Sequence, residues 1–116
     1  DLEGLVQRAV AECESFAPSI VYLPWPGERH GDHRAVSVAI ARALRRIRFA
    51  GTALGYEVWT PMPAEIVLDL APVAELKRRA IQRYETPLGY VDYERTIFGL
   101  HAYRSLLLTD ARVEID

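Results

Sequence analysis

The stretch SIVYLPWPGERHGDHRAVSVAIARAL, residues 19–44, predicts the fold class of this chain. Its first eight residues form a short apolar run, rich in β-branched and aromatic side chains and bounded by prolines. This composition is typical of a strand that is buried on both faces of a parallel sheet. A loop is predicted over 27–31. A helix is predicted over 33–49, because apolar side chains recur there at helical spacing, and Asp32 is the candidate N-cap.

Helical and strand patterns also flank this stretch. An amphipathic helix is predicted over 2–16, since apolar residues recur at i, i+3, i+4 and i+7, and Pro18 ends it. Gly51 and Gly55 are predicted to end the helix that starts at residue 33. Two further strands are then expected, and they are YEVWT (56–60) and EIVLDL (65–70), joined through Pro61 and Pro63.

Two helices are predicted in the last part of the chain. One begins at Pro72, a residue favoured at the first helical position, and the other covers about 92–107. The first of them is expected to pair Glu75 with Arg79 on its outer side. Its predicted inner face consists of Val73, Leu76, Ala80 and Tyr84. Residues 85–92 are expected to form a loop, and the tail to Asp116 carries no clear pattern.

This order of elements is an α/β pattern. It favours a three-layer αβα sandwich, Rossmann-like, around a largely parallel sheet, with residues 1–116 in a single domain.

Composition narrows the class of protein. The chain has 116 residues and a formal net charge of −2, which argues against a nucleic-acid-binding module. Its arginine clusters, around residues 42–48 and 77–83, are expected on solvated helical faces. Its single cysteine, Cys13, falls on the apolar side of the first helix and is expected to be a buried thiol. No apolar run approaches the ~20 residues that a membrane span needs, and no signal peptide is recognised, so a cytoplasmic location is expected.

The loop before the helix at residue 33 has the residue types of a catalytic site. In open α/β sheets, ligands bind outside the carboxyl ends of the strands, which is where His30, Asp32 and His33 are predicted. The dipole of the helix favours the neutral, metal-binding form of His33, and Asp32 could orient an imidazole. Both histidines could instead be ligands. Alternatively, Asp32 is only a helix cap and the two histidines are exposed loop residues.

The wider context of this loop resembles the LmbE/PIG-L family of zinc-dependent N-acetylglucosaminyl deacetylases. Members of that family carry H-P-D-H at the mouth of a helix, where this chain has His30-Gly31-Asp32-His33. Three later segments are similar to family motifs in the same order: YEVWTPMP, VLDLAPVAELKRRAIQRYET and FGLHAYRS. The resemblance covers about residues 2–107.

The resemblance implies a role for each matching residue. His33 would be a Zn²⁺ ligand. His30 would stabilise the oxyanion intermediate or protonate the leaving amine, and Asp32 would orient and tune His30. Glu57 matches a glutamate near the family's site, and Arg104 lies in the late Y-R pair, where a structural ion pair is the alternative. The substrate would be a small acylated amino-sugar conjugate, and family members often assemble into homo-oligomers.

The chain departs from the family pattern in two places. It contains no H-P-D-D-E segment, which in the family supplies the other two zinc ligands and the general base. We therefore expect the chain to be the C-terminal part of a deacetylase domain, incomplete for catalysis by itself. A metal-free binding or scaffold domain derived from the same fold is the alternative. Thr86-Pro87 also replaces the serine–glutamine of many members.

Overall fold

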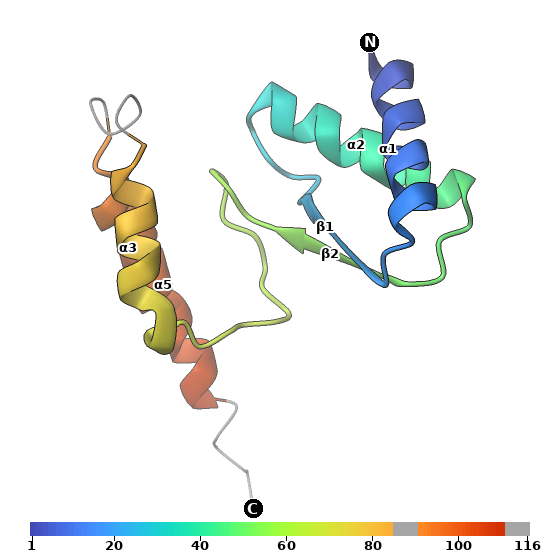
Figure 1. Cartoon of the computed structure of the whole chain (residues 1–116). Coiled ribbons are helices and arrows are strands. Elements are labelled where there is room, and N and C mark those ends of the chain that lie inside the picture. Colours follow the sequence, from blue (N-terminus) through green and yellow to red (C-terminus); the bar gives the residue numbers. More distant parts are fainter. Residues whose placement is uncertain (85–90, 111–116) are drawn as a thin grey trace, which may run out of the picture. The chain divides into compact units, whose positions relative to one another are not determined.

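The structure is a computed structural model that describes residues 1–84 and 91–110 (Figure 1). Its described part is a mixed α/β structure with four α-helices and a two-stranded parallel sheet. The chain divides into two compact units, Asp1–Pro63 and Ala64–Asp116, and each is described separately below. The Thr86-Pro87 departure lies outside the described residues.

The first helix, α1 (Leu2–Phe16), has defined caps at both ends. The side chain of Asp1 accepts a hydrogen bond from the backbone N–H of Glu3, at 3.1 Å. Ala17 adopts a left-handed conformation, with φ of 50°, and its N–H donates to the carbonyl of Cys13. The helix therefore ends just before Pro18, as predicted. Cys13 itself is only half-buried.

A β–α–β unit follows α1. Strand β1 (Ile20–Pro24) leads through a loop into α2 (Gly31–Arg46), and β2 (Thr52–Tyr56) then pairs with β1 in parallel. The register matches Ile20 with Thr52 and Pro24 with Tyr56. This parallel pairing confirms the α/β class.

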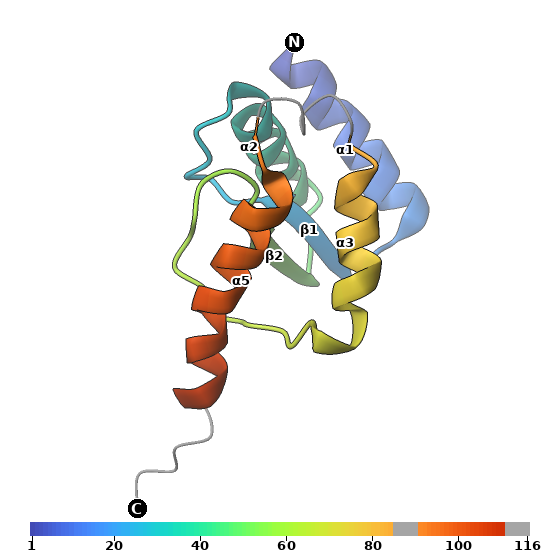
Figure 2. The same ribbon diagram turned by 90° about the vertical axis from the view of Figure 1, so that its left-hand side faces the viewer.

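The core of the first unit lies between its two helices. Val6 of α1 and Ala39 and Ala43 of α2 are almost fully buried, and small side chains on α2 let the helices approach closely. Both helices lie on the same side of the sheet (Figures 1 and 2). Leu23 of β1 is also buried, with 8% of its surface exposed.

Within the first unit, no described helix covers the opposite face of β1, whereas this strand was predicted to be buried on both faces. Ile20 and Tyr22 alternate with Val21 and Leu23, and they are 48% and 62% exposed. The physical reason is the period of two along a strand, which sends alternate side chains to opposite faces, while α1 and α2 cover only one.

The predicted strands at 56–60 and 65–70 are not formed. Strand β2 begins and ends four residues earlier than the first of them, and Gly55 lies within β2 rather than after the helix. Residues 65–70 have no regular structure. A cause can be identified for the first of the two predicted strands. The N–H groups of residues 58–60 bind a side-chain carboxylate, so they are not available to a sheet.

The second unit contains a short 3₁₀ helix, η1 (Ala71–Val73), and the helices α3 (Ala74–Gln82) and α5 (Tyr93–Asp110). Pro72 lies in η1, so the helical segment starts where predicted. The predicted inner face of α3 is wrong, since Val73, Leu76 and Tyr84 are 46%, 60% and 65% exposed whereas Ile81 is buried. Packing against α5 determines the face, and the sequence pattern did not contain that information.

Charged residues of α3 hold it to α5. Arg78 pairs with Glu94 and lies over the ring of Phe98, at 4.4 Å from the ring centroid. Glu75 pairs with Arg78 at 3.5 Å, so the predicted partner, Arg79, is wrong by one position. The basic cluster at residues 77–83 was predicted on a solvated face, but one of its members, Arg78, packs against α5.

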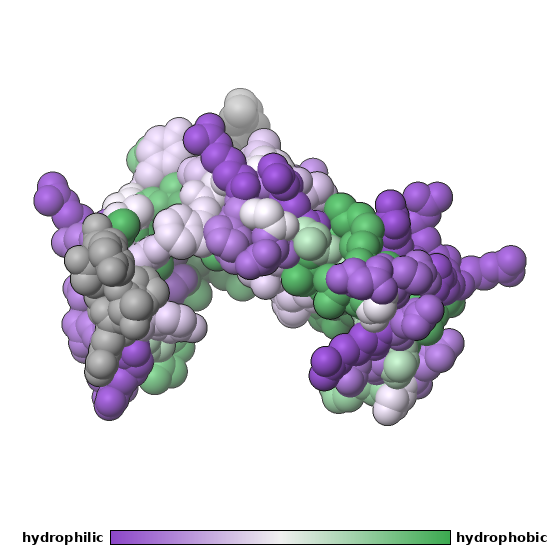
Figure 3. Space-filling view, turned by 90° about the horizontal axis from the view of Figure 1, so that it is seen from above, coloured by the Kyte–Doolittle hydropathy of each residue, from purple (hydrophilic) through white to green (hydrophobic). Residues whose placement is uncertain are grey.

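Elsewhere the surface is mixed in charge. Figure 3 shows hydrophilic side chains over much of the face that it presents, with hydrophobic ones between them. The arginines of α2, at 42, 45 and 46, are exposed, as predicted. Within the described part of the chain, no helix combines the length and the apolar character needed to cross a membrane.

Candidate functional site

The candidate site lies where the two parallel strands end. The loop of residues 25–30 follows β1, and a second loop, residues 57–63, follows β2. Because β1 and β2 run in parallel, both loops leave the same edge of the sheet, which is the edge where α/β proteins build their sites. All the contacts below lie within the first unit.

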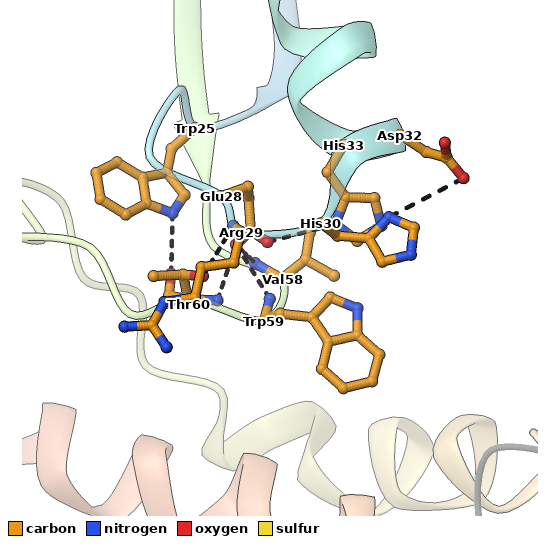
Figure 4. A network of polar contacts seen from close by, with 9 residues as sticks. All are labelled: Trp25, Glu28, Arg29, His30, Asp32, His33, Val58, Trp59 and Thr60. Atoms are coloured by element: carbon orange, nitrogen blue, oxygen red, sulfur yellow. Dashed lines mark hydrogen bonds and ion pairs between the residues drawn. The ribbon is translucent and has the colours of Figure 1, made fainter.

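A buried carboxylate, Glu28, joins the two loops (Figure 4). Its side chain is completely buried. One oxygen, Oε1, accepts hydrogen bonds from three consecutive backbone N–H groups, those of Val58, Trp59 and Thr60, at 3.0, 3.0 and 2.9 Å. Three donors on one oxygen are an unusually strong set for a single side chain. They explain how a charged group is tolerated in the interior.

The second oxygen of Glu28 faces His33 in the first turn of α2. Oε2 lies 3.3 Å from Nδ1 of the imidazole, and the His33 side chain is 26% exposed. Burial raises the pKa of Glu28, but the hydrogen bonds from the backbone of residues 58–60 and from His33 outweigh it and lower the pKa to about 2. Glu28 is therefore an anion at any physiological pH.

Two further hydrogen bonds join the two loops. The indole Nε1 of Trp25 donates to the carbonyl of Thr60 at 2.9 Å, and the N–H of Arg29 donates to the Thr60 hydroxyl at 3.1 Å. The ring of Trp25 lies directly over Gly27, where a Cβ would collide with it. The loop sequence therefore holds Glu28 and its neighbours in a fixed place.

The predicted cap of α2 is wrong. Helix α2 begins at Gly31, so His30 is the N-cap residue and Asp32 lies in the first turn, with no side-chain cap hydrogen bond. The side chain of Asp32 is 92% exposed, and its Oδ2 is 4.0 Å from Nδ1 of His30. That separation is within ion-pair range and too long for a hydrogen bond. The helix dipole stabilises a carboxylate in the first turn of a helix, even when the carboxylate makes no cap hydrogen bond.

The two histidines are close together. The ring centroids of His30 and His33 are 4.7 Å apart, with an angle of 37° between the ring planes, and both rings project from the start of α2 (Figure 4). The structure thus brings His30, Asp32 and His33 into one cluster. The functional roles expected for them stay predictions.

The other two predicted residues have different positions. Glu57 follows β2 and accepts a hydrogen bond from the N–H of Met62 at 2.9 Å, which holds the second loop in shape. Arg104 is a half-buried residue of α5 in the second unit. It is therefore not among the residues that the first unit brings together.

Glu28 is the residue that sequence reasoning missed. Asp32 was the only carboxylate predicted beside the histidines, and the carboxylate that contacts His33 is that of Glu28, five residues earlier in the chain. A glutamate in a polar loop is ordinarily a solvated charge, so Glu28 was not predicted as a site residue. Its position between the end of a strand and two histidines was the available signal.

The described residues do not contain a complete metal site. Among the side chains described in residues 1–84 and 91–108, no three of histidine, cysteine, aspartate or glutamate are placed to hold a metal ion together.

Comparison with known proteins adds no further assignment. No protein-family model, curated protein or solved structure matches this chain.

Proposed function

We propose that this chain forms one wall of the active site of a zinc-dependent N-deacetylase, which hydrolyses the N-acyl group of a glucosaminyl-type substrate. The observation that carries the proposal is the contact of the buried Glu28 carboxylate with Nδ1 of His33. In histidines that bind zinc, the other ring nitrogen usually donates its N–H to a carboxylate or a carbonyl. The location at the carboxyl ends of β1 and β2, and the resemblance of four ordered motifs, support the same proposal.

His33 would supply one zinc ligand. A catalytic zinc site usually has three protein ligands and an open position for water. Since the described residues do not hold three such groups together, the other two ligands and the general base would come from polypeptide outside them. When bound, zinc activates water and polarises an amide carbonyl.

His30 would act on the leaving group. Its side chain is half-exposed and lies beside His33, so it can face a substrate bound at that ring. An imidazole there can hold a proton and donate it to the departing amine nitrogen. Asp32, at ion-pair distance from His30, would orient that ring. The products of such a hydrolysis are a carboxylate and a free amino sugar.

The proposal also includes a larger fold than the described sheet. Parallel sheets are almost always covered on both faces, and two strands alone are too few for a stable sheet. The exposed Ile20 and Tyr22 support a three-layer, Rossmann-like arrangement in which further helices cover that face.

Two measurements on the full-length protein test this function. We expect about one equivalent of zinc per chain, and zinc-dependent release of acetate from N-acetylglucosaminyl conjugates. A metal chelator should abolish that release, and restored zinc should recover it. A full-length protein that binds no zinc would overturn the proposal and favour a metal-free scaffold domain.

A further inference from the structure

Glu28 has two sets of partners, one on each carboxylate oxygen. Oε1 accepts from the N–H groups of Val58, Trp59 and Thr60, and Oε2 faces Nδ1 of His33. The side chain is completely buried, so water cannot replace either set of partners. Each oxygen of this carboxylate is thus held by its own partners.

A carboxylate anion can only accept hydrogen bonds. Its neighbour at 3.3 Å, Nδ1, must therefore be the donor. A neutral imidazole carries one N–H, so a proton on Nδ1 leaves the lone pair on Nε2. Nε2 makes no hydrogen bond to a residue of the described chain, and the ring is 26% exposed.

We propose that Glu28 is a positioning residue that selects the Nδ1–H tautomer of His33 and directs the Nε2 lone pair outward, and that the same carboxylate fixes residues 58–60 beside that ring. This inference rests on the proposed function for its purpose, which is to prepare Nε2 as a metal ligand. The tautomer itself is a property of this chain and can be measured without metal or substrate.

The geometry favours Glu28 over Asp32 for this role. Asp32 is the nearer residue in sequence, but its side chain is 92% exposed and lies 4.0 Å from His30. An exposed carboxylate exchanges its hydrogen bonds with water, so it cannot impose one tautomer on a ring. Glu28 is buried and held by three further donors.

The chain offers an informative substitution, Glu28→Gln. The amide oxygen of glutamine can still accept from residues 58–60, whereas its NH₂ group would occupy the position of Oε2. Since NH₂ is a donor, His33 would have to present an unprotonated Nδ1 and carry its proton on Nε2. The variant thus preserves the shape of the site and reverses the tautomer.

The test is the ¹⁵N chemical shifts of the His33 ring in the ¹⁵N-labelled 116-residue chain, at a pH where the ring is neutral. We expect the unchanged chain to have a protonated Nδ1 and an unprotonated Nε2, and Glu28→Gln to exchange these assignments. Asp32→Asn and the exposed α1 variant Glu12→Gln should leave His33 as it is. If the unchanged chain has the Nε2–H form that free histidine prefers, or if Asp32→Asn alters the tautomer, the inference is wrong.

The unchanged chain decides the question even if Glu28→Gln does not fold. A second measurement separates this inference from the proposed function. In the full-length protein, Glu28→Gln should weaken zinc binding by about 10- to 100-fold. The Nδ1–H tautomer without zinc binding would overturn the function and leave the inference intact. Zinc bound by a protein whose His33 has the Nε2–H tautomer would overturn the inference alone.

Discussion

The Oε2 atom of Glu28 lies 3.3 Å from Nδ1 of His33, across the junction between a strand and a helix. This relationship explains why a loop with an exposed surface contains a fully buried acid. The other oxygen of Glu28 holds three backbone N–H groups of the loop after β2. One side chain therefore contacts a histidine 5 residues later in the chain and a loop that begins 30 residues later.

Glu28 should make the chain sensitive to acid. Its pKa is lowered to about 2 from an ordinary value of 4.5, so ionised Glu28 stabilises the fold fully above pH 4.5. That stabilisation should be lost as the pH falls from about 4.5 to about 2. Chemical denaturation at a series of pH values measures it. Glu28→Gln should show a flatter dependence on pH in this range, whereas Glu12→Gln should match the unchanged chain. An equal slope in all three proteins would contradict this origin of acid sensitivity.

Gly31→Pro should stabilise the chain. Gly31 is the first residue of α2, where proline is favoured because its missing N–H has no helical partner. His30 already has φ of −68° and ψ of 128°, the conformation that a following proline requires. A Cβ at Gly31 meets no atom within 4 Å. We expect the free energy of unfolding to rise by about 1 kcal/mol, chiefly because the unfolded chain loses freedom. Gly31→Ala should raise the free energy of unfolding by less. A lower free energy of unfolding for the proline variant would contradict the described start of α2.

Gly51→Ala should destabilise the first unit. A Cβ there would collide with the backbone carbonyl oxygen of Ser19, which accepts the N–H of Thr52, and with the ring of Phe49. Since the backbone must move to relieve the contact, the free energy of unfolding should fall by about 1–3 kcal/mol. Gly99→Ala is the matched control, because a Cβ at this position of α5 meets nothing within 4 Å. Its free energy of unfolding should instead rise by about 0.5–1 kcal/mol, because alanine has a higher helix propensity than glycine. Thermal unfolding of both variants compares the two effects, and similar shifts would argue against the close packing at Gly51.

Local patterns predicted the elements that local forces determine. The bounds of α1 followed from apolar spacing and from Pro18, and β1 was recognised from its β-branched and aromatic composition. The strand expected at 56–60 was wrong because a distant side chain, Glu28, binds the N–H groups that a sheet would need. The inner face of α3 was wrong for a similar reason, since Arg78 reaches across to Glu94. Tertiary partners of this kind leave no trace in local spacing.

The candidate site was predicted in part. The clustering of His30, Asp32 and His33 follows from their proximity in sequence, and their position at the end of a parallel strand followed from the α/β pattern. The role of Asp32 beside His30 stays a prediction, whereas the contact of a second carboxylate, Glu28, with His33 was not predicted. Burial decides which carboxylate can fix an imidazole, and burial at Glu28 depends on a loop about 30 residues further on.

The zinc content of purified full-length protein, compared between His33→Ala and His30→Ala, tests the proposed function most directly. His33 is proposed as a ligand, so its removal should reduce bound zinc from about one equivalent per chain to a small fraction. His30 is proposed to serve the leaving group, so His30→Ala should retain zinc while deacetylation falls by about 10²- to 10⁴-fold. Full zinc occupancy in His33→Ala would contradict the proposal that this histidine holds the metal.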